Sequence, residues 1–149
     1  MIYLGIVAGI FVLDFFIKRY VDKKYDRKVK HSKLGGFAYI EKYYNDGAML
    51  NLLEKRPVLL KVIQTAFMVA VGVWFYFSMR KNDGVVAEKL GTAFLVGGGL
   101  SNLFDRYTKG HVVDYLGFNF GPKWFRRIVF NVSDFFVFIG GVLMVVGHK

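Results

Sequence analysis

Four long apolar runs limit what this chain can fold into. They lie at residues 2–18, 58–79, 85–105 and 128–147. Each is close to the roughly 20 residues that a helix needs to cross about 30 Å of hydrocarbon. The mean hydropathy of +0.35 is also high for a soluble domain of this size. We therefore predict one mainly α-helical, integral membrane domain over residues 1–149, with four transmembrane helices.

The first run has an alternative interpretation as a cleaved signal peptide. It has no basic segment before it and no small-residue cleavage site after it, so a membrane helix is favoured. The chain has no cysteine, which excludes disulfides, thiol catalysis and thiolate metal sites. The net charge of +10 is concentrated in loops beside the apolar runs. This pattern favours contact with anionic lipid head groups over binding to nucleic acid.

The loops have distinct characters. Residues 19–57 are basic at first, and the aromatic stretch 34–44 predicts short strands on the membrane surface, followed by a turn at residues 45–47. Residues 106–127 form the last loop, broken by glycines and a proline. Four spans place these two loops on the same side of the membrane. The positive-inside rule would put the basic first loop in the cytoplasm, so charge alone leaves the orientation open.

Two aspartates lie in strongly apolar sequence, Asp114 in the last loop and Asp134 at the start of the fourth run. A carboxylate at membrane depth costs roughly 2.5–3.5 kcal/mol, so such acids are candidate functional groups. If the loop folds back, the two carboxyls meet and share one proton, and they then act together as base and acid. The alternative is two unrelated acids paired with Arg126 or Arg127.

Other polar residues have spacings that place them on one helical face. Asp14 and Lys18 are four apart, so they either support a polar site or form a pair in which Lys18 extends to the membrane surface. Asn131 lies three residues before Asp134 and can hydrogen-bond near it. At the end of the third run, Asn102, Asp105 and Arg106 lie at positions i, i+3 and i+4, and so on one helical face. They form either a shell around the acids or a polar helix end.

Metal and serine chemistry are poorly supported. The histidines His31, His111 and His148 are scattered and form no metalloprotease motif. Ser101 could act with His111, but the sequence around it is not a nucleophile elbow. We therefore expect no metal and no cofactor.

Taken together, these residues resemble the lipoprotein signal peptidases (signal peptidase II), which are bacterial membrane aspartic proteases. Five motifs of that family occur in the family's order along most of the chain. They are Asp14 with Lys18; Asn45-Asp46-Gly47-Ala48; Gly97-Gly98 followed by Asn102, Asp105 and Arg106; Gly110-His111-Val112-Val113-Asp114; and Phe130-Asn131-Val132-Ser133-Asp134.

The resemblance implies an endopeptidase that cuts prolipoproteins just before a diacylglyceryl-modified cysteine, without a metal. The catalytic residues would be Asp114 and Asp134. The substrate-binding or supporting residues would be Asp14, Lys18, Asn45, Gly47, Ala48, Asn102, Asp105, Arg106 and Asn131.

It also implies a place in the cell and a set of partners. The protein would be a multi-pass protein of the bacterial inner membrane, with both termini cytoplasmic and the active site at the outer leaflet. The first loop would form a small β-rich cradle outside the cytoplasm. Expected partners are lipid-modified prolipoproteins, membrane lipids and globomycin-type inhibitors, with no nucleic acid, and we expect a monomer.

Several positions depart from the family pattern. Ser101 stands where glycine is usual, Ser133 where alanine is usual, and residues 49–51 replace the common Ala-Phe-Ser. The first loop is unusually basic. The competing hypothesis is a non-catalytic lipid- or peptide-binding membrane protein on the same scaffold. A small transporter is disfavoured because four helices are few and no inverted repeat is present.

Overall fold

The computed structural model describes residues 1–48, 52–81 and 85–147. The departure at residues 49–51 and the histidine at position 148 lie outside these residues. The four long helices are α1 (Ile2–Lys24), α2 (Pro57–Arg80), α3 (Val86–Thr108) and α4 (Val132–Gly147). The strands are β1 (His31–Lys33), β2 (Ala38–Asn45), β3 (Val112–Phe118) and β4 (Val129–Phe130), with short 3₁₀ helices η1 (Leu34–Gly36) and η3 (Phe125–Arg127).

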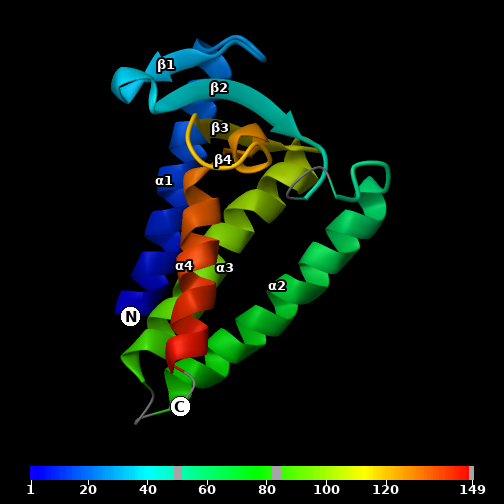
Figure 1. Cartoon of the computed structure of the whole chain (residues 1–149). Coiled ribbons are helices and arrows are strands. Elements are labelled where there is room, and N and C mark those ends of the chain that lie inside the picture. Colours follow the sequence, from blue (N-terminus) through cyan, green and yellow to red (C-terminus); the bar gives the residue numbers. More distant parts are fainter. Residues whose placement is uncertain (49–51, 82–84, 148–149) are drawn as a thin grey trace.

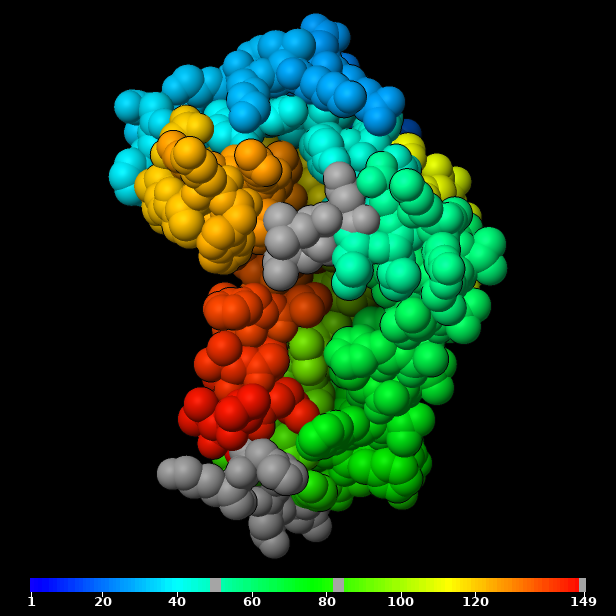
Figure 2. Space-filling model, turned by 45° about the vertical axis from the view of Figure 1, so that its right-hand side comes forward, coloured from blue at the N-terminus to red at the C-terminus, as the bar shows by residue number. Residues whose placement is uncertain are grey.

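The helices run between two ends of the molecule. Figure 1 shows the sheet across one end and both termini at the other. Helix α3 packs against each of the other three helices, while α2 leans away from α4 toward the sheet end. The space-filling view in Figure 2 shows a hollow between α2 and α4. An apolar groove of about 540 Å³ lies between α2, α3 and α4, where Phe67, Val71, Trp74, Leu95 and Met144 line it.

The sheet is built from both loops, which corrects the prediction of a cradle in the first loop alone. Its four strands are antiparallel in the order β1-β2-β3-β4. Of the strands predicted over residues 34–44, β2 is confirmed, whereas residues 34–36 form η1 and β1 lies before this stretch. Strands β3 and β4 come from the last loop and the start of the fourth apolar run. The residues Val112, Val113, Tyr115 and Leu116 favour a strand, and the surrounding glycines obscure this signal. The register of β2 on β3 pairs Tyr43 with Asp114.

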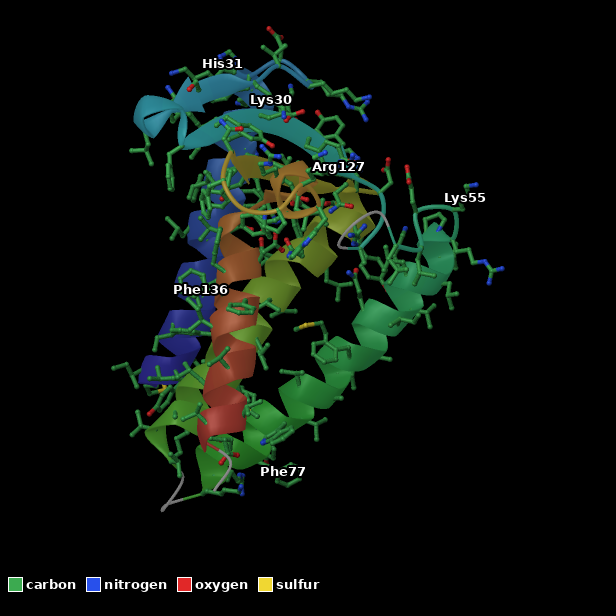
Figure 3. All side chains as sticks on the ribbon, in the orientation of Figure 1. Lys30, His31, Lys55, Phe77, Arg127 and Phe136 are labelled. Atoms are coloured by element: carbon green, nitrogen blue, oxygen red, sulfur yellow. The ribbon has the colours of Figure 1, made fainter. Side chains whose placement is uncertain are left out.

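Polar side chains occupy the interior of this molecule. The fully buried side chains include Lys18, Asn131, Asp14 and Ser133. Large apolar side chains are exposed along all four helices, and Phe77 is an example that is 60% exposed. Figure 3 shows Lys30, His31, Lys55 and Arg127 at the sheet end, away from the helix surface that carries Phe77. Large exposed apolar surfaces mark contact with a membrane or another protein.

Among the described residues, one helix, Pro57–Arg80, is long and apolar enough to cross a membrane, and Val132–Gly147 is a shorter apolar helix. Helices α1 and α3 carry buried charged residues that lower their hydropathy, among them Asp14, Lys18 and Asp105. Helix α1 continues beyond residue 18 to Lys24. The fourth helix begins at Val132 and not at residue 128, because the preceding residues form β4.

Glycines allow α3 and α4 to approach closely. A Cβ on Gly98 would lie 2.6 Å from the carbonyl oxygen of Ser133, and one on Gly140 would lie 2.8 Å from that of Gly91. These approaches are closer than side chains tolerate, so the small residues at these positions set the helix spacing. Close approach of helices at small residues is typical of membrane bundles.

Candidate active site

Asp114 and Asp134 are brought together from two elements. Asp114 lies in β3 and is 2% exposed, and Asp134 lies in the first turn of α4 and is partly exposed. Asn131 contacts both carboxyls: its Nδ2 donates to Asp114 Oδ1 at 2.7 Å, and its backbone N donates to Asp134 Oδ2 at 2.9 Å. The prediction that the last loop folds back to join the two acids agrees with this geometry.

The start of α4 fixes the position of Asp134. Asn131 is the N-cap residue, and its Oδ1 accepts the backbone N–H of Asp134 at 3.0 Å. Asp134 returns the contact by accepting the backbone N–H of Asn131. This reciprocal pair is a capping box, which satisfies backbone donors that the helix itself leaves without partners. One residue thus caps the helix and connects the two acids.

Each carboxyl oxygen of the pair accepts an amide N–H. Asn45 Nδ2 donates to Asp114 Oδ2 at 2.8 Å, and Asn102 Nδ2 donates to Asp134 Oδ1 at 2.9 Å. With the two contacts from Asn131, all four oxygens have one neutral donor. The predicted alternative of pairing with Arg126 or Arg127 is wrong, because both arginines are exposed and the acids bond to these amides.

Lys18 sets the direction of the Asn102 amide. Its Nζ is buried and donates to Asn102 Oδ1 at 2.8 Å. An ammonium group has no acceptor, so the amide oxygen must face Lys18 and the amide nitrogen must face Asp134. Lys18 also pairs with Asp14 at 2.7 Å and with Asp105 at 3.2 Å. The hypothesis that Lys18 extends to the membrane surface is therefore wrong, and the hypothesis that it supports a polar site is favoured.

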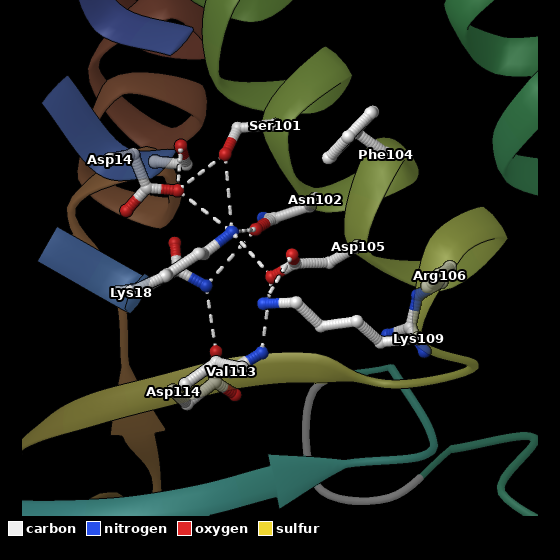
Figure 4. Close-up of polar contacts among 12 residues, drawn as sticks. Asp14, Lys18, Ser101, Asn102, Phe104, Asp105, Arg106, Lys109, Val113 and Asp114 are labelled. Atoms are coloured by element: carbon white, nitrogen blue, oxygen red, sulfur yellow. Dashed lines mark hydrogen bonds and ion pairs between the residues drawn. The ribbon is translucent and has the colours of Figure 1, made fainter. Parts of the chain in front are cut away.

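Asp105 joins α3 to β3. Its Oδ2 accepts the backbone N–H of Val113, next to Asp114, at 3.3 Å, and its Oδ1 pairs with Lys109 at 3.0 Å. Figure 4 shows these contacts together with those of Lys18. Because Val113 precedes Asp114 directly, this bond helps to fix the strand that carries the acid.

Arg106 ties the turn after β2 to the site. It donates to the backbone oxygens of Asn45, at 3.3 Å, and of Gly47. The Asn45 side chain also accepts the backbone N–H of Gly47 at 3.1 Å, which closes the predicted turn. The backbone N–H of Ala48 donates to the oxygen of Leu52. The first loop is thereby held where Asn45 reaches Asp114.

The environment of Asp114 favours its protonated form. Burial raises the pKa of Asp114 well above the usual carboxyl range, and the negative charge of Asp134 raises it further. Hydrogen bonds from Asn45 and Asn131 oppose this shift by stabilising the carboxylate. A pair of this kind holds one proton over a range in which isolated carboxyls are ionised.

Three residues of the site were missed as partners of Asp14. Ser101 and Ser133 each donate to Asp14 Oδ2 at 2.6 Å, and the Tyr115 hydroxyl donates to Asp14 Oδ1 at 3.2 Å. The only sequence signal for them is the presence of hydroxyl groups beside motif residues. The possible Ser101–His111 pair is wrong for two reasons. The Ser101 hydroxyl donates to Asp14, and the His111 ring instead stacks on Tyr44, with ring centroids 4.0 Å apart.

The residues that the structure describes contain no group of three or more histidine, aspartate or glutamate side chains that could hold a metal ion. The polar groups that the site brings together are the two carboxyls, their amide donors and the nearby cations Lys18 and Arg106.

Comparison with known proteins agrees with this arrangement. The family model described as Signal peptidase (SPase) II matches residues 6–148. The chain belongs to the signal peptidase II family. Similar proteins include the lipoprotein signal peptidase of Listeria welshimeri, which is 30% identical over 98% of this chain and 92% of its own length. That of Chromobacterium violaceum is 29% identical over 95% and 86%, respectively.

Solved structures support the fold of this signal peptidase II family member. Two structures described as a bacterial membrane enzyme match it with TM-scores of 0.83 and 0.81, each at 22% identity and over 97% of this chain. The matched regions cover 85% and 90%, respectively, of the two solved chains. The arrangement of four helices with a small antiparallel sheet is thus one that a membrane enzyme adopts.

Proposed function

We propose that Asp114 and Asp134 are the catalytic pair with which this enzyme cleaves prolipoproteins immediately before a diacylglyceryl-modified cysteine. Membership of the signal peptidase II family makes the chain an aspartic endopeptidase that removes signal peptides from prolipoproteins. The observation that carries the catalytic assignment is Asn131, which donates to both carboxyls. The remaining oxygens accept from Asn45 and Asn102.

The reaction follows from one proton shared by two acids. The ionised carboxyl removes a proton from a water molecule, and the water oxygen attacks the carbonyl carbon of the residue before the cysteine. The protonated carboxyl donates its proton to the carbonyl oxygen, which gives a tetrahedral diol. Collapse of the diol breaks the C–N bond: the carboxylate of the pair takes a proton from one diol hydroxyl, and the other carboxyl gives its proton to the leaving cysteine nitrogen. The pair is thereby returned to its one-proton state. We assign no order of roles to the two acids, because they titrate together.

Repulsion between the two acids favours this single-proton state. Lys18 and Arg106 both lie close enough for their charges to act on the pair. These cations also serve other acids, since Lys18 pairs with Asp14 and Asp105 at 2.7 and 3.2 Å. Two carboxylates held together at a buried site repel each other, so loss of the second proton is costly.

The supporting residues have distinct proposed roles. Asn45, Asn102 and Asn131 orient the acids. Asp14, Lys18 and Asp105 hold those asparagines and β3 in place. Arg106 holds the backbone of Asn45 and Gly47, and the turn that they form with Ala48 borders the substrate. Chelation would leave cleavage unchanged, since we expect no metal and no cofactor to take part.

We further propose that all four helices span the bacterial inner membrane, at approximate residues 2–18, 58–79, 85–105 and 128–147. The exposed apolar side chains on all four helices and the buried ion pair of Asp14 and Lys18 support this. Polar groups inside and apolar groups outside suit a chain surrounded by lipid. The sheet would lie at the outer leaflet, with both termini in the cytoplasm.

Cysteine labelling tests the orientation, since the native chain has no cysteine. Two exposed positions at opposite ends of the helices make a matched pair, His31 in β1 and Lys81 after α2. In whole cells, a membrane-impermeant maleimide is expected to label His31→Cys and not Lys81→Cys. The reverse pattern would contradict the orientation.

The activity is tested by a gel-shift assay with purified protein and a lipid-modified prolipoprotein. We expect cleavage that globomycin blocks and that EDTA does not change, with a monomer in detergent as the active species. The matched control is the same substrate with serine in place of the lipidated cysteine, which is expected to remain uncut. Binding of the lipidated substrate without any cleavage would favour the alternative of a non-catalytic binding protein.

A further inference from the structure

A second buried cluster lies beside the catalytic pair and centres on Asp14. This side chain is 0% exposed, and its two oxygens accept from four side chains. Oδ2 accepts from Lys18 at 2.7 Å and from Ser101 and Ser133 at 2.6 Å each, and Oδ1 accepts from Tyr115 at 3.2 Å. The donors come from α1, α3, α4 and β3. Asp14 is therefore a point at which four of the elements that carry the site meet.

The two serine hydroxyls stabilise the charged form of Asp14. Each makes a short hydrogen bond to a carboxylate, and bonds to charged groups contribute more than bonds between neutral groups. Ser101 also accepts from Lys18 Nζ at 3.2 Å. Both serines are buried, at 3% and 0% exposure, so water cannot replace them easily. Without them, Asp14 Oδ2 would have Lys18 as its single remaining partner among these contacts.

The position of Lys18 in turn controls the amides on the catalytic pair. Lys18 faces Asn102 Oδ1, which directs Asn102 Nδ2 to Asp134. Asn131 Nδ2 donates to the same Asn102 oxygen at 3.0 Å and to Asp114 at 2.7 Å. An unbroken series of contacts thus runs from Asp14 through Lys18 and Asn102 to both acids.

We propose that Ser101 and Ser133 are positioning residues for cleavage, which act through Asp14 and Lys18 on the amide donors of the catalytic pair. This proposal rests on the proposed function of Asp114 and Asp134. It makes the serine pair part of the enzyme's catalytic support and not only of its helix packing. Neither serine contacts the catalytic carboxyls, so their effect passes through Lys18 and Asn102.

The test compares the kinetics of the Ser101→Ala/Ser133→Ala double variant with those of the native enzyme. Because both serines are buried and act through Lys18 and Asn102, we expect kcat to fall about 10-fold and KM to stay within twofold. The control is Ser78→Ala, which removes a buried serine of α2 far from the site, and it is expected to leave kcat unchanged. A native kcat in a folded double variant would overturn the proposal.

A second measurement separates positioning from simple packing. In an Asp14→Asn background, the serine substitutions are expected to cause no further loss of kcat, because their partner carboxylate is already gone. An undiminished 10-fold loss in that background would overturn the proposal. If Asp14→Asn is inactive or the double variant does not fold, each single serine variant is tested instead, and a native kcat in both would overturn the proposal. Full activity of Asp114→Asn would instead refute the proposed function, and this result is measured independently of the serine variants.

Discussion

Asn131 is the residue whose loss should reveal most about this site, since it caps α4 and contacts both acids. Substitution by alanine removes two kinds of contact. The first is the cap bond to the Asp134 N–H at 3.0 Å, which contributes about 1 kcal/mol. The second is the set of bonds that Nδ2 donates, to Asp114 Oδ1 at 2.7 Å and to Asn102 Oδ1 at 3.0 Å, which together contribute about 1.5–3 kcal/mol.

The comparison with serine separates these contributions. Serine still caps a helix but cannot reach Asp114 with an amide, so Asn131→Ser should lose only the second contribution. We expect thermal unfolding in detergent to show Asn131→Ala destabilised by about 2.5–4 kcal/mol and Asn131→Ser by about 1 kcal/mol less.

The two variants should lose similar amounts of activity. If the bond to Asp114 is made in the transition state, its loss lowers kcat about 10- to 150-fold, at 1.36 kcal/mol for each factor of ten. The assay is cleavage of a lipid-modified prolipoprotein followed by gel shift at saturating substrate. Full activity in a folded Asn131→Ser variant would refute the role of Asn131 as the residue that orders the pair.

Three further changes test other parts of the site. Because the pKa of Asp114 is raised, the pair keeps its proton at pH values where an ordinary carboxyl is ionised. We expect activity to persist at those pH values and to fall as pH rises through the raised pKa. A fall in activity centred near pH 4 would contradict this. Gly98→Ala brings a Cβ to 2.6 Å from the backbone oxygen of Ser133, so α4 must shift, and we expect both the unfolding temperature and kcat to fall. The control is Gly5→Ala, whose Cβ meets nothing within 4 Å and which should be neutral in both assays. Lys18→Met leaves buried carboxylates without their cation and should cost about 3–5 kcal/mol in thermal unfolding, and a variant as stable as the native protein would argue against a buried ion pair.

Helices and much of the polar site could be predicted from local sequence. The apolar runs are long enough to indicate four helices, and the spacing of Asn131 and Asp134 places both at one helix start. Apolar character alone gave the wrong first residue for α4, because Val129 and Phe130 continue the run but form strand β4. The signal that corrects this is the capping box, since an asparagine three residues before an acid marks a helix start.

The sheet and the Asp14 cluster depend on contacts between distant parts of the chain. Pairing of β2 with β3 joins residues about 70 positions apart, and its register changes between Ile40 and Tyr43. No local pattern encodes such pairing. Likewise, nothing in the sequence indicated that Ser101 and Ser133 share Asp14 as a partner, because this contact depends on the packing of α1 against α3 and α4.

The central claim is that Asp114 and Asp134 together perform the cleavage. The most direct measurement is the rate at which Asp114→Asn and Asp134→Asn, each verified as folded by thermal unfolding, cut a lipid-modified prolipoprotein. Asparagine keeps the size of the side chain but cannot act as an acid or base. The account predicts that each variant alone abolishes cleavage while substrate binding persists. Native cleavage rates in either variant would contradict it.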